Sequence, residues 1–305
     1  MADKLENTFQ GYSTLAKSKE MVEQSKQVED SPQTASPSYQ LAFDDPDFML
    51  QDEQRDIRLM LEWQKPERIL NDHNIEATWV VFGSARIGSS QQINDKIAIV
   101  NAKIKTLQET DTEYQELTKQ KAILQKLEEK SFYYDLCTEL TKRLANPVNT
   151  GIHATVITGG GPGIMEAANK GAALANWPSI GLNIVLPTEQ EPNHYISPEF
   201  CFQFHYFAIR KMHFLMRAKA LIAFPGGLGT LDEVMETLTL LQTGRIKQKF
   251  PVILFGESYW RKIVNFDALV EEGVISENDL GLFCFVDTVD DALAYIINYY
   301  REHEF

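Results

Sequence analysis

Cysteine, long apolar runs and positive charge are all scarce in this sequence of 305 residues. The three cysteines, Cys137, Cys201 and Cys284, stand far apart and lack the paired spacing of zinc sites and dithiol redox motifs, so we expect buried thiols in a reducing cytosol. No run approaches the roughly eighteen apolar residues of a membrane helix, and the first residues lack the apolar core of a signal peptide. These absences predict a soluble, cytoplasmic protein.

Basic residues are outnumbered by acidic ones. The 43 Asp and Glu residues against 29 Lys and Arg residues give a formal net charge of -14. Such a field repels phosphate backbones and anionic lipid, so the composition predicts neither a nucleic-acid partner nor a membrane partner. Any phosphate site must therefore be local. The hydrophobic content of 44% is ample for a large core.

Two common nucleotide-binding signatures are missing. A dinucleotide site needs G-x-G-x-x-G after the first strand and an acidic residue closing the second. Here Gly159, Gly161 and Gly163 follow the second predicted strand and not the first. Glu166 stands where the motif would have its last glycine or an alanine, and the second strand ends in Thr158 instead of an acidic residue. The sequence also contains no G-x-x-x-x-G-K-[ST], which removes support for P-loop chemistry.

The chain divides into a polar tail and one large domain. Residues 1–38 are rich in Ser, Gln, Lys and Glu and are predicted to be a disordered tail, whereas residues 39–305 are predicted to form a single domain that begins with a helical extension. A Lys-, Gln- and Glu-rich stretch at about 101–130, with leucines at helical spacing, predicts a charged helical insertion. It is either a solvated helix or hairpin, or a partner-binding arm.

Short β-branched runs alternate with helical patterns from Thr78 onward. This alternation predicts an α/β fold, a Rossmann-like doubly wound parallel sheet flanked by helices. The expected strands are Thr78 to Phe82, Ala154 to Thr158, Ile180 to Leu186, Ala220 to Phe224, Pro251 to Phe255 and Phe283 to Val286.

Three loops should meet where the strand order of this sheet reverses. They are residues 82–86, 158–163 and 224–230, and the last two are glycine-rich strand-to-helix turns. Their backbone amides and helix N-termini suit a phosphate group. A single glycine-rich turn is equally explained as a tight turn, but two at one switch point favour a ligand.

Charged residues near these loops have two interpretations each. Thr230 and Glu233 fit a helix capping box, or Glu233 is a carboxylate that binds ribose hydroxyls and orients water. Arg210 and Lys211 lie on a mostly aromatic helix, where they either extend to solvent or face the anion site. His205 and His213 lack acidic partners for a metal site.

The segments Arg210-Lys211 and Pro225-Gly226-Gly227-Leu228-Gly229-Thr230-Leu231-Asp232-Glu233 resemble the RK and PGGxGTxxE motifs of the Lonely Guy (LOG) family of cytokinin riboside 5'-monophosphate phosphoribohydrolases. The resemblance spans roughly Thr78 to the C-terminus. It implies that Arg210 and Glu233 are the catalytic pair. With the three loops, it gives as candidate substrate-binding residues Ser84, Arg86, Gly160, Gly161, Gly163, Glu189, Lys211, Gly226, Gly227, Gly229, Thr230 and Thr239. Thr239 is equally explained as a packed helical threonine.

The function that this resemblance implies is hydrolysis of the N-glycosidic bond of a nucleoside 5'-monophosphate, AMP or an N6-substituted cytokinin riboside 5'-monophosphate. The products are a free base and ribose 5-phosphate. The enzyme would be an N-glycosidase that needs no metal or organic cofactor, and it would form a homodimer or larger homo-oligomer. Two alternatives stay open: a broad purine or pyrimidine 5'-monophosphate nucleosidase, and a non-catalytic carrier of a nucleotide or cofactor. Proteins with these motifs are often labelled lysine decarboxylases, but no feature indicates a pyridoxal phosphate lysine.

Overall fold

A computed structural model of the chain describes residues 18–186 and 191–303. Its contacts separate the chain into two units, one ending at His73 and the other running from Asn74 to Phe305. The sequence predicted a boundary after residue 38, between a tail and a single domain, whereas the contacts divide the chain after His73. The predicted domain division stays a prediction. No helix in the two described ranges has the length and apolar character needed to cross a membrane.

The N-terminal unit consists of short helices followed by one long one. Its elements are α1 (Ser18–Ser25), η2 (Pro37–Tyr39), η3 (Ala42–Asp44), α2 (Pro46–Met49), η4 (Asp52–Gln54) and α3 (Arg55–Asp72). Asp45 caps α2, because its carboxylate accepts a hydrogen bond from the Phe48 amide at 3.1 Å. Helix α1 lies inside the segment that composition assigns to a disordered tail, whereas the helical extension expected after residue 39 is present.

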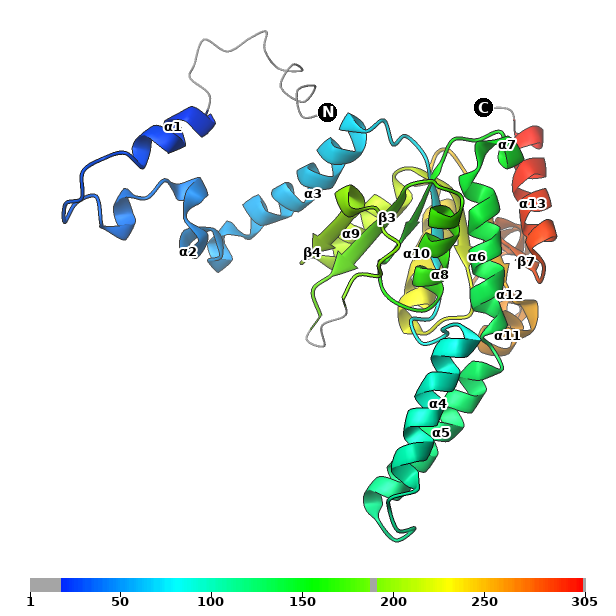
Figure 1. Cartoon of the computed structure of the whole chain (residues 1–305). Helices are drawn as coiled ribbons and strands as arrows, with labels where there is room; N and C mark the ends of the chain where they lie inside the picture. The colour runs from blue at the N-terminus through cyan, green and yellow to red at the C-terminus, as the bar shows by residue number, and fades with distance from the viewer. Residues whose placement is uncertain (1–17, 187–190, 304–305) are drawn as a thin grey trace. The chain divides into compact units, whose positions relative to one another are not determined.

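A parallel sheet of seven strands forms the centre of the second unit (Figure 1). The strands are β1 (Thr78–Phe82), β2 (Thr155–Thr158), β3 (Ser179–Ile184), β4 (Cys201–Phe204), β5 (Ala218–Ala223), β6 (Val252–Phe255) and β7 (Cys284–Val286). Their order is β4-β3-β2-β1-β5-β6-β7, and every pairing is parallel. The direction of winding reverses between β1 and β5, which confirms the doubly wound, Rossmann-like prediction.

Helices cover both faces of the sheet. They are α6 (Phe132–Ala145), α7 (Pro147–Thr150), α8 (Ile164–Leu174), α9 (Phe207–Leu215), α10 (Leu228–Gln242), α11 (Glu257–Ile263), α12 (Phe266–Glu271) and α13 (Val289–Glu302), with short turns η5 (Pro198–Phe200) and η6 (Glu277–Leu282). Trp79 and Val81 of β1 share one buried cluster with α6, α8 and α13. Phe82 points to the other face, since side chains alternate along a strand, and it stacks edge-to-face on Phe214 of α9 at 4.8 Å.

The charged insertion is a pair of packed helices, α4 (Ser90–Ile104) and α5 (Thr112–Glu128), which lie side by side and project from the sheet (Figure 1). We call this pair the arm. Val100 of α4 and Leu117 and Leu124 of α5 form a small core of its own. The arm therefore begins about ten residues before the predicted insertion of about 101–130, and of the two forms considered for it, a single helix or a hairpin, it is a hairpin.

Candidate nucleotide site

The three predicted loops meet at the carboxyl ends of β1, β2 and β5. Ser84 connects them, because its backbone amide donates to the carbonyl of Pro225 at 2.9 Å and its carbonyl accepts from the amide of Ile164 at 3.1 Å. The first loop thus joins the third loop on one side and the start of α8 on the other. The sheet-reversal crevice brings together the segments expected there.

Two helices begin at this crevice without a side-chain cap. Gly163 is the N-cap of α8 and Gly227 is the N-cap of α10, and neither residue can supply a capping side chain. Thr230 lies inside α10 rather than at its N-cap, so the capping-box interpretation of Thr230 and Glu233 is wrong. The first amide of α8, that of Ile164, already donates to the Ser84 carbonyl. The first amides of α10 are therefore the ones available to an anion, in the partial positive field of that helix end.

Glycine is required at several points because other chain segments come close. Gly163 has a φ of 71°, and a Cβ there would lie 2.4 Å from the carbonyl oxygen of Ser84. Gly160 has a φ of 77°, and a Cβ there would lie 2.3 Å from Asn183 Oδ1. By contrast, a Cβ at Gly227 or Gly229 would meet no atom within 4 Å. These last two glycines are exposed and leave the third loop open to a ligand.

A buried amide network holds the second loop, and the sequence alone did not indicate it. Asn193 Nδ2 donates to the carbonyls of Gly160 and Gly161 at 3.2 and 3.1 Å, and to Asn169 Oδ1 at 2.9 Å. Asn169 Oδ1 also accepts from the hydroxyl of Thr158 at 2.7 Å. The carbonyls of Gly160 and Gly161 thus bond within the protein, and so does the Gly160 amide, which donates to the hydroxyl of Thr158 at 3.0 Å.

Arg210 extends from α9 to the second loop rather than into solvent. Its Nε donates to the carbonyl of Leu182 in β3 at 2.7 Å, and its guanidinium lies over the ring of Phe214, 5.1 Å from the centroid. A Cβ at Gly159 would lie 2.6 Å from Arg210 Nη2. Burial lowers the pKa of Arg210, and the nearby carboxylate of Glu233 raises it in part. The Nη groups therefore lie beside the second loop.

Glu233 lies on the first turns of α10, with only 4% of its surface exposed. Its Oε2 atom is buried and accepts no hydrogen bond from the described residues. Burial raises the pKa of Glu233 to about 7, although the positive charges of Lys211 and Arg210 oppose this effect. A buried carboxyl that titrates near neutral pH and keeps a free oxygen is poised for proton transfer or for stabilising a cation.

Lys211 forms ion pairs with the carboxylates on either side of Glu233. Its Nζ lies 2.8 Å from Asp232 Oδ2 and 2.5 Å from Glu236 Oε2. Burial lowers the pKa of Lys211, but the two hydrogen-bonded carboxylates outweigh burial and the pKa is raised. Lys211 thus pairs directly with Asp232 and Glu236 and offsets part of their negative charge, and it acts on Glu233 only through its nearby positive charge.

The remaining candidate residues divide by position. Gly226 packs closely against Thr230, which is buried within α10. Arg86 is exposed on the first loop. Thr239 is also exposed, and its hydroxyl donates to the carbonyl of Met235 in its own helix at 2.8 Å, so the structure does not bring it into the crevice. Glu189 lies outside the described residues.

In residues 18–186 and 191–303, no group of three or more His, Cys, Asp or Glu residues is arranged to hold a metal ion. All three cysteines are free, but only Cys137 is buried; Cys201 is exposed and Cys284 is half-buried. The expectation of three buried thiols is therefore wrong for two of them, because Cys201 begins the edge strand β4 and Cys284 begins the edge strand β7.

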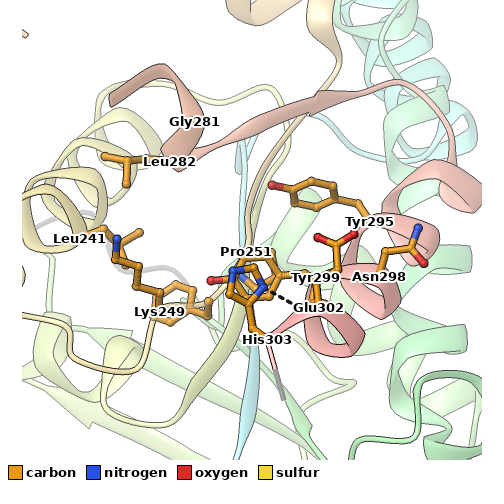
Figure 2. Close-up of a pocket in the computed structure, with 11 residues that line it drawn as sticks. Leu241, Lys249, Pro251, Gly281, Leu282, Tyr295, Asn298, Tyr299, Glu302 and His303 are labelled. Carbon is orange, nitrogen blue, oxygen red and sulfur yellow. Dashed lines mark hydrogen bonds between the residues drawn. The ribbon is translucent and has the colours of Figure 1, made fainter. Parts of the chain in front are cut away.

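Two hollows lie at opposite ends of the strands. One, of about 470 Å³, lies at the amino end of β6 beside Pro251 and the last turns of α13, where Tyr299, Glu302 and His303 line it (Figure 2). It is far from the strand ends at which the three loops meet. A smaller hollow, of about 250 Å³, lies at the candidate site itself and is lined by Ser84 and Gly226.

The middle and C-terminal part of the chain matches a known family. Residues 165–296 match the family model described as "Possible lysine decarboxylase". This range contains Arg210, Lys211 and Glu233, but it contains neither the first two loops nor the arm.

Curated relatives carry the name cytokinin riboside 5'-monophosphate phosphoribohydrolase. LOG4 of Arabidopsis thaliana is 34% identical over 96 residues, which cover 31% of this chain and 44% of the relative. LOG7 of the same plant is 41% identical over 68 residues, or 22% of this chain and 31% of the relative. The probable enzyme LOGL3 of Oryza sativa subsp. japonica is 32% identical over 96 residues, or 31% and 45%. The chain thus spans under half the length of these relatives, and the resemblance to the LOG family is confirmed over that part.

Solved structures are more distant. TM1055 is 19% identical with a TM-score of 0.39, covering 72% of this chain and 98% of that chain. The molybdenum cofactor carrier protein from Chlamydomonas reinhardtii is 23% identical with a TM-score of 0.36, covering 54% and 85%. Sequence identities and TM-scores this low support no conclusion about function. The fold assignment rests on the strand order described above.

Proposed function

We propose that this protein hydrolyses the N-glycosidic bond of nucleoside 5'-monophosphates. The observation that carries the proposal is Glu233, a buried carboxyl with a free oxygen and a pKa of about 7, close enough to Arg210 and Lys211 for their charges to shift that pKa. It stands on the first turns of α10, directly after a glycine-rich loop with uncapped amides. An acid–base group beside an anion site is what cleavage of a phosphorylated riboside requires.

The 5'-phosphate is bound by backbone amides at the start of α10. Gly227 and Gly229 are open on their exposed side, so a phosphate can approach the backbone closely. Ser84 lies next to this loop through its hydrogen bond to Pro225. The phosphate end of the substrate is thereby fixed, and the ribose extends toward Glu233.

Glu233 and Arg210 act at the bond that breaks. The bond between base and ribose C1' opens, C1' gains positive charge, and the ionised form of Glu233 stabilises that charge and orients water. Water oxygen then bonds to C1', and the proton it loses balances the proton gained by the departing base. Arg210, held against the second loop by Leu182, binds the nucleotide or stabilises the leaving base.

A substrate panel tests the proposal. The protein is incubated with AMP, GMP and N6-isopentenyl-AMP, and with adenosine as the control without phosphate, and the products are separated by chromatography. We expect free base together with ribose 5-phosphate from at least one monophosphate, and a far slower reaction of adenosine. Release of nucleoside and inorganic phosphate instead, or tight nucleotide binding without base release, would refute the proposal; the second result would favour a carrier.

The same panel measures base preference. Efficient cleavage of N6-isopentenyl-AMP over AMP and GMP would place the activity with cytokinin riboside monophosphates, the substrates in the relatives' names. Similar rates across the panel would indicate the broad nucleosidase.

We further propose that the protein is a cytoplasmic homo-oligomer that binds neither nucleic acid nor membranes. Its free thiols fit a reducing compartment, and its charge of -14 opposes anionic polymers and lipids. Large apolar side chains are exposed on α9 and its C-cap, where Phe207, Met212 and Met216 are 52%, 49% and 42% exposed, and Leu228 at the start of α10 is 86% exposed. Light scattering on the purified protein gives the assembly size, and a strict monomer would contradict this proposal.

A further inference from the structure

The hollow of about 250 Å³ at the candidate site is partly built by the arm. Ser84 of the first loop, Gly226 and Gly227 of the third loop and Tyr259 of α11 form one part of its lining. Lys126 and Lys130, at the base of the arm, form another. The family match begins at residue 165, so the comparisons assign no role to these lysines.

The two lysines are the only charged side chains that line this hollow, judged over the part of the chain that the structure describes. Neither forms an ion pair with a carboxylate there. Lys130 Nζ donates one hydrogen bond to the carbonyl of Lys126 at 3.2 Å, which leaves further donors on both ammonium groups. Although the protein has a net charge of -14, the hollow beside its glycine-rich loop is lined by two positively charged side chains.

The base of the arm is anchored to the sheet. Leu127, between the two lysines, packs against both the small core of the arm and the main core. The chain then enters α6, whose Tyr134, Cys137 and Leu140 are buried in the main core. The lysine backbones are therefore held in a fixed position relative to the third loop.

Tyr259 positions the loop rather than binding an anion. Its hydroxyl donates a hydrogen bond to the carbonyl of Gly226. Burial raises the pKa of Tyr259, and that bond lowers it in part. This contact occupies the Gly226 carbonyl with a protein donor, so the lysines are the charged groups that the hollow offers to a ligand.

The size of the hollow suits one group of a ligand. Pockets for whole small molecules usually measure roughly 300–1,000 Å³, and this one is smaller. We propose that Lys126 and Lys130 are further binding residues of the proposed enzyme, and that they hold the 5'-phosphate of the nucleotide against the loop of Gly226 and Gly227. This inference rests on the proposed function for the identity of the ligand. Its anion chemistry, two ammonium groups facing backbone amides, can be tested separately.

The test uses the double variant Lys126→Gln/Lys130→Gln and, as matched control, Lys119→Gln/Lys121→Gln on the same helix, whose residues do not line the hollow. Inorganic phosphate is the probe, followed by calorimetry or phosphorus NMR. We expect the Kd for phosphate to rise roughly tenfold or more in the first variant and to stay within about twofold in the control. Lys126→Arg/Lys130→Arg should retain binding. Equal Kd values for wild type and the first variant, or the same loss in the control, would overturn the inference.

Turnover provides a second measurement. With AMP, the first variant should raise KM about tenfold while kcat falls much less, and the ratio of kcat/KM for AMP over adenosine should fall by a similar factor. Lysine-dependent phosphate binding without any base release would retain this subsite and refute the proposed function. If the protein releases base but the Kd for phosphate is the same in wild type and in Lys126→Gln/Lys130→Gln, the proposed function would stand and the lysine subsite would be refuted.

Discussion

The guanidinium of Arg210 occupies the space that a side chain at Gly159 would need. A Cβ at that position would lie 2.6 Å from Arg210 Nη2 and 2.8 Å from Met165 Sδ. The second loop and the α9 arginine therefore fit together only because residue 159 is glycine. We predict that Gly159→Ala displaces Arg210 and lowers kcat/KM for base release by roughly tenfold or more, since small misplacements of a catalytic group are costly.

The matched control for this change is Gly281→Ala, where a Cβ would meet no atom within 4 Å. Activity and thermal unfolding of both variants are compared with wild type. An unaltered kcat/KM in Gly159→Ala would contradict the assignment of Arg210 to the site.

Glu233 makes stability depend on pH. Burial raises its pKa from about 4.5 to about 7, so the unfolded chain loses this proton at lower pH than the folded protein does. Stability contributed by the protonated form is therefore lost as pH rises from about 4.5 through 7. Between pH 5 and pH 8, wild type should lose roughly 2–3 kcal/mol more than Glu233→Gln, which cannot ionise. Urea unfolding at both pH values measures this, and an identical pH dependence in the two proteins would refute the buried, ionisable state.

Lys211 tunes the same group. Its positive charge lowers the pKa of Glu233, and its ion pairs with Asp232 and Glu236 offset two charges that raise it. Lys211→Met should therefore move the Glu233 limb of the pH profile of kcat/KM to higher pH, by roughly half a unit or more, whereas Lys211→Arg should leave it nearly in place. A profile unchanged or moved to lower pH in the Met variant would show that another group governs the limb.

Asn193 supports the second loop from inside. Asn193→Ala would remove the Nδ2 bonds to the carbonyls of Gly160 and Gly161. The Gly160 carbonyl keeps its bond of 2.9 Å from the backbone amide of residue 193, whereas the buried Gly161 carbonyl loses its side-chain donor. We expect a loss of roughly 2–3 kcal/mol in urea unfolding and a raised KM. Asn149→Ala removes a single bond of 2.8 Å to Arg143 at an exposed position, and should cost less than about 1 kcal/mol. Equal losses in both variants would contradict a buried network at the loop.

The sheet was predictable because its strands are short β-branched runs between glycine-rich turns. Six expected strands match β1, β2, β3, β5, β6 and β7 to within two residues at either end. The seventh, β4 (Cys201–Phe204), was missed. It is an edge strand of four residues whose side chains alternate between exposed and buried, so it lacks the apolar run that marks a central parallel strand.

The candidate site was predictable only in part. Loop positions followed from strand order, since parallel strands end at one edge. Long-range packing set the rest: Lys126 and Tyr259 come to Gly226 from distant segments, and Asn193 lies in a loop with no motif. Spacing could not decide between a capping box and a free carboxyl at Glu233, because the answer depends on α10 beginning at Leu228.

Quantifying ribose 5-phosphate after incubation with AMP most directly tests the central claim, that Glu233 and Arg210 cleave a nucleotide held by backbone amides at the sheet reversal. Wild type, Glu233→Gln and Arg210→Ala are compared under saturating substrate, with circular dichroism to verify folding. We predict ribose 5-phosphate and adenine in equal amounts from wild type, and rates at least about a hundredfold lower in both variants. Undiminished product from either folded variant would contradict the account.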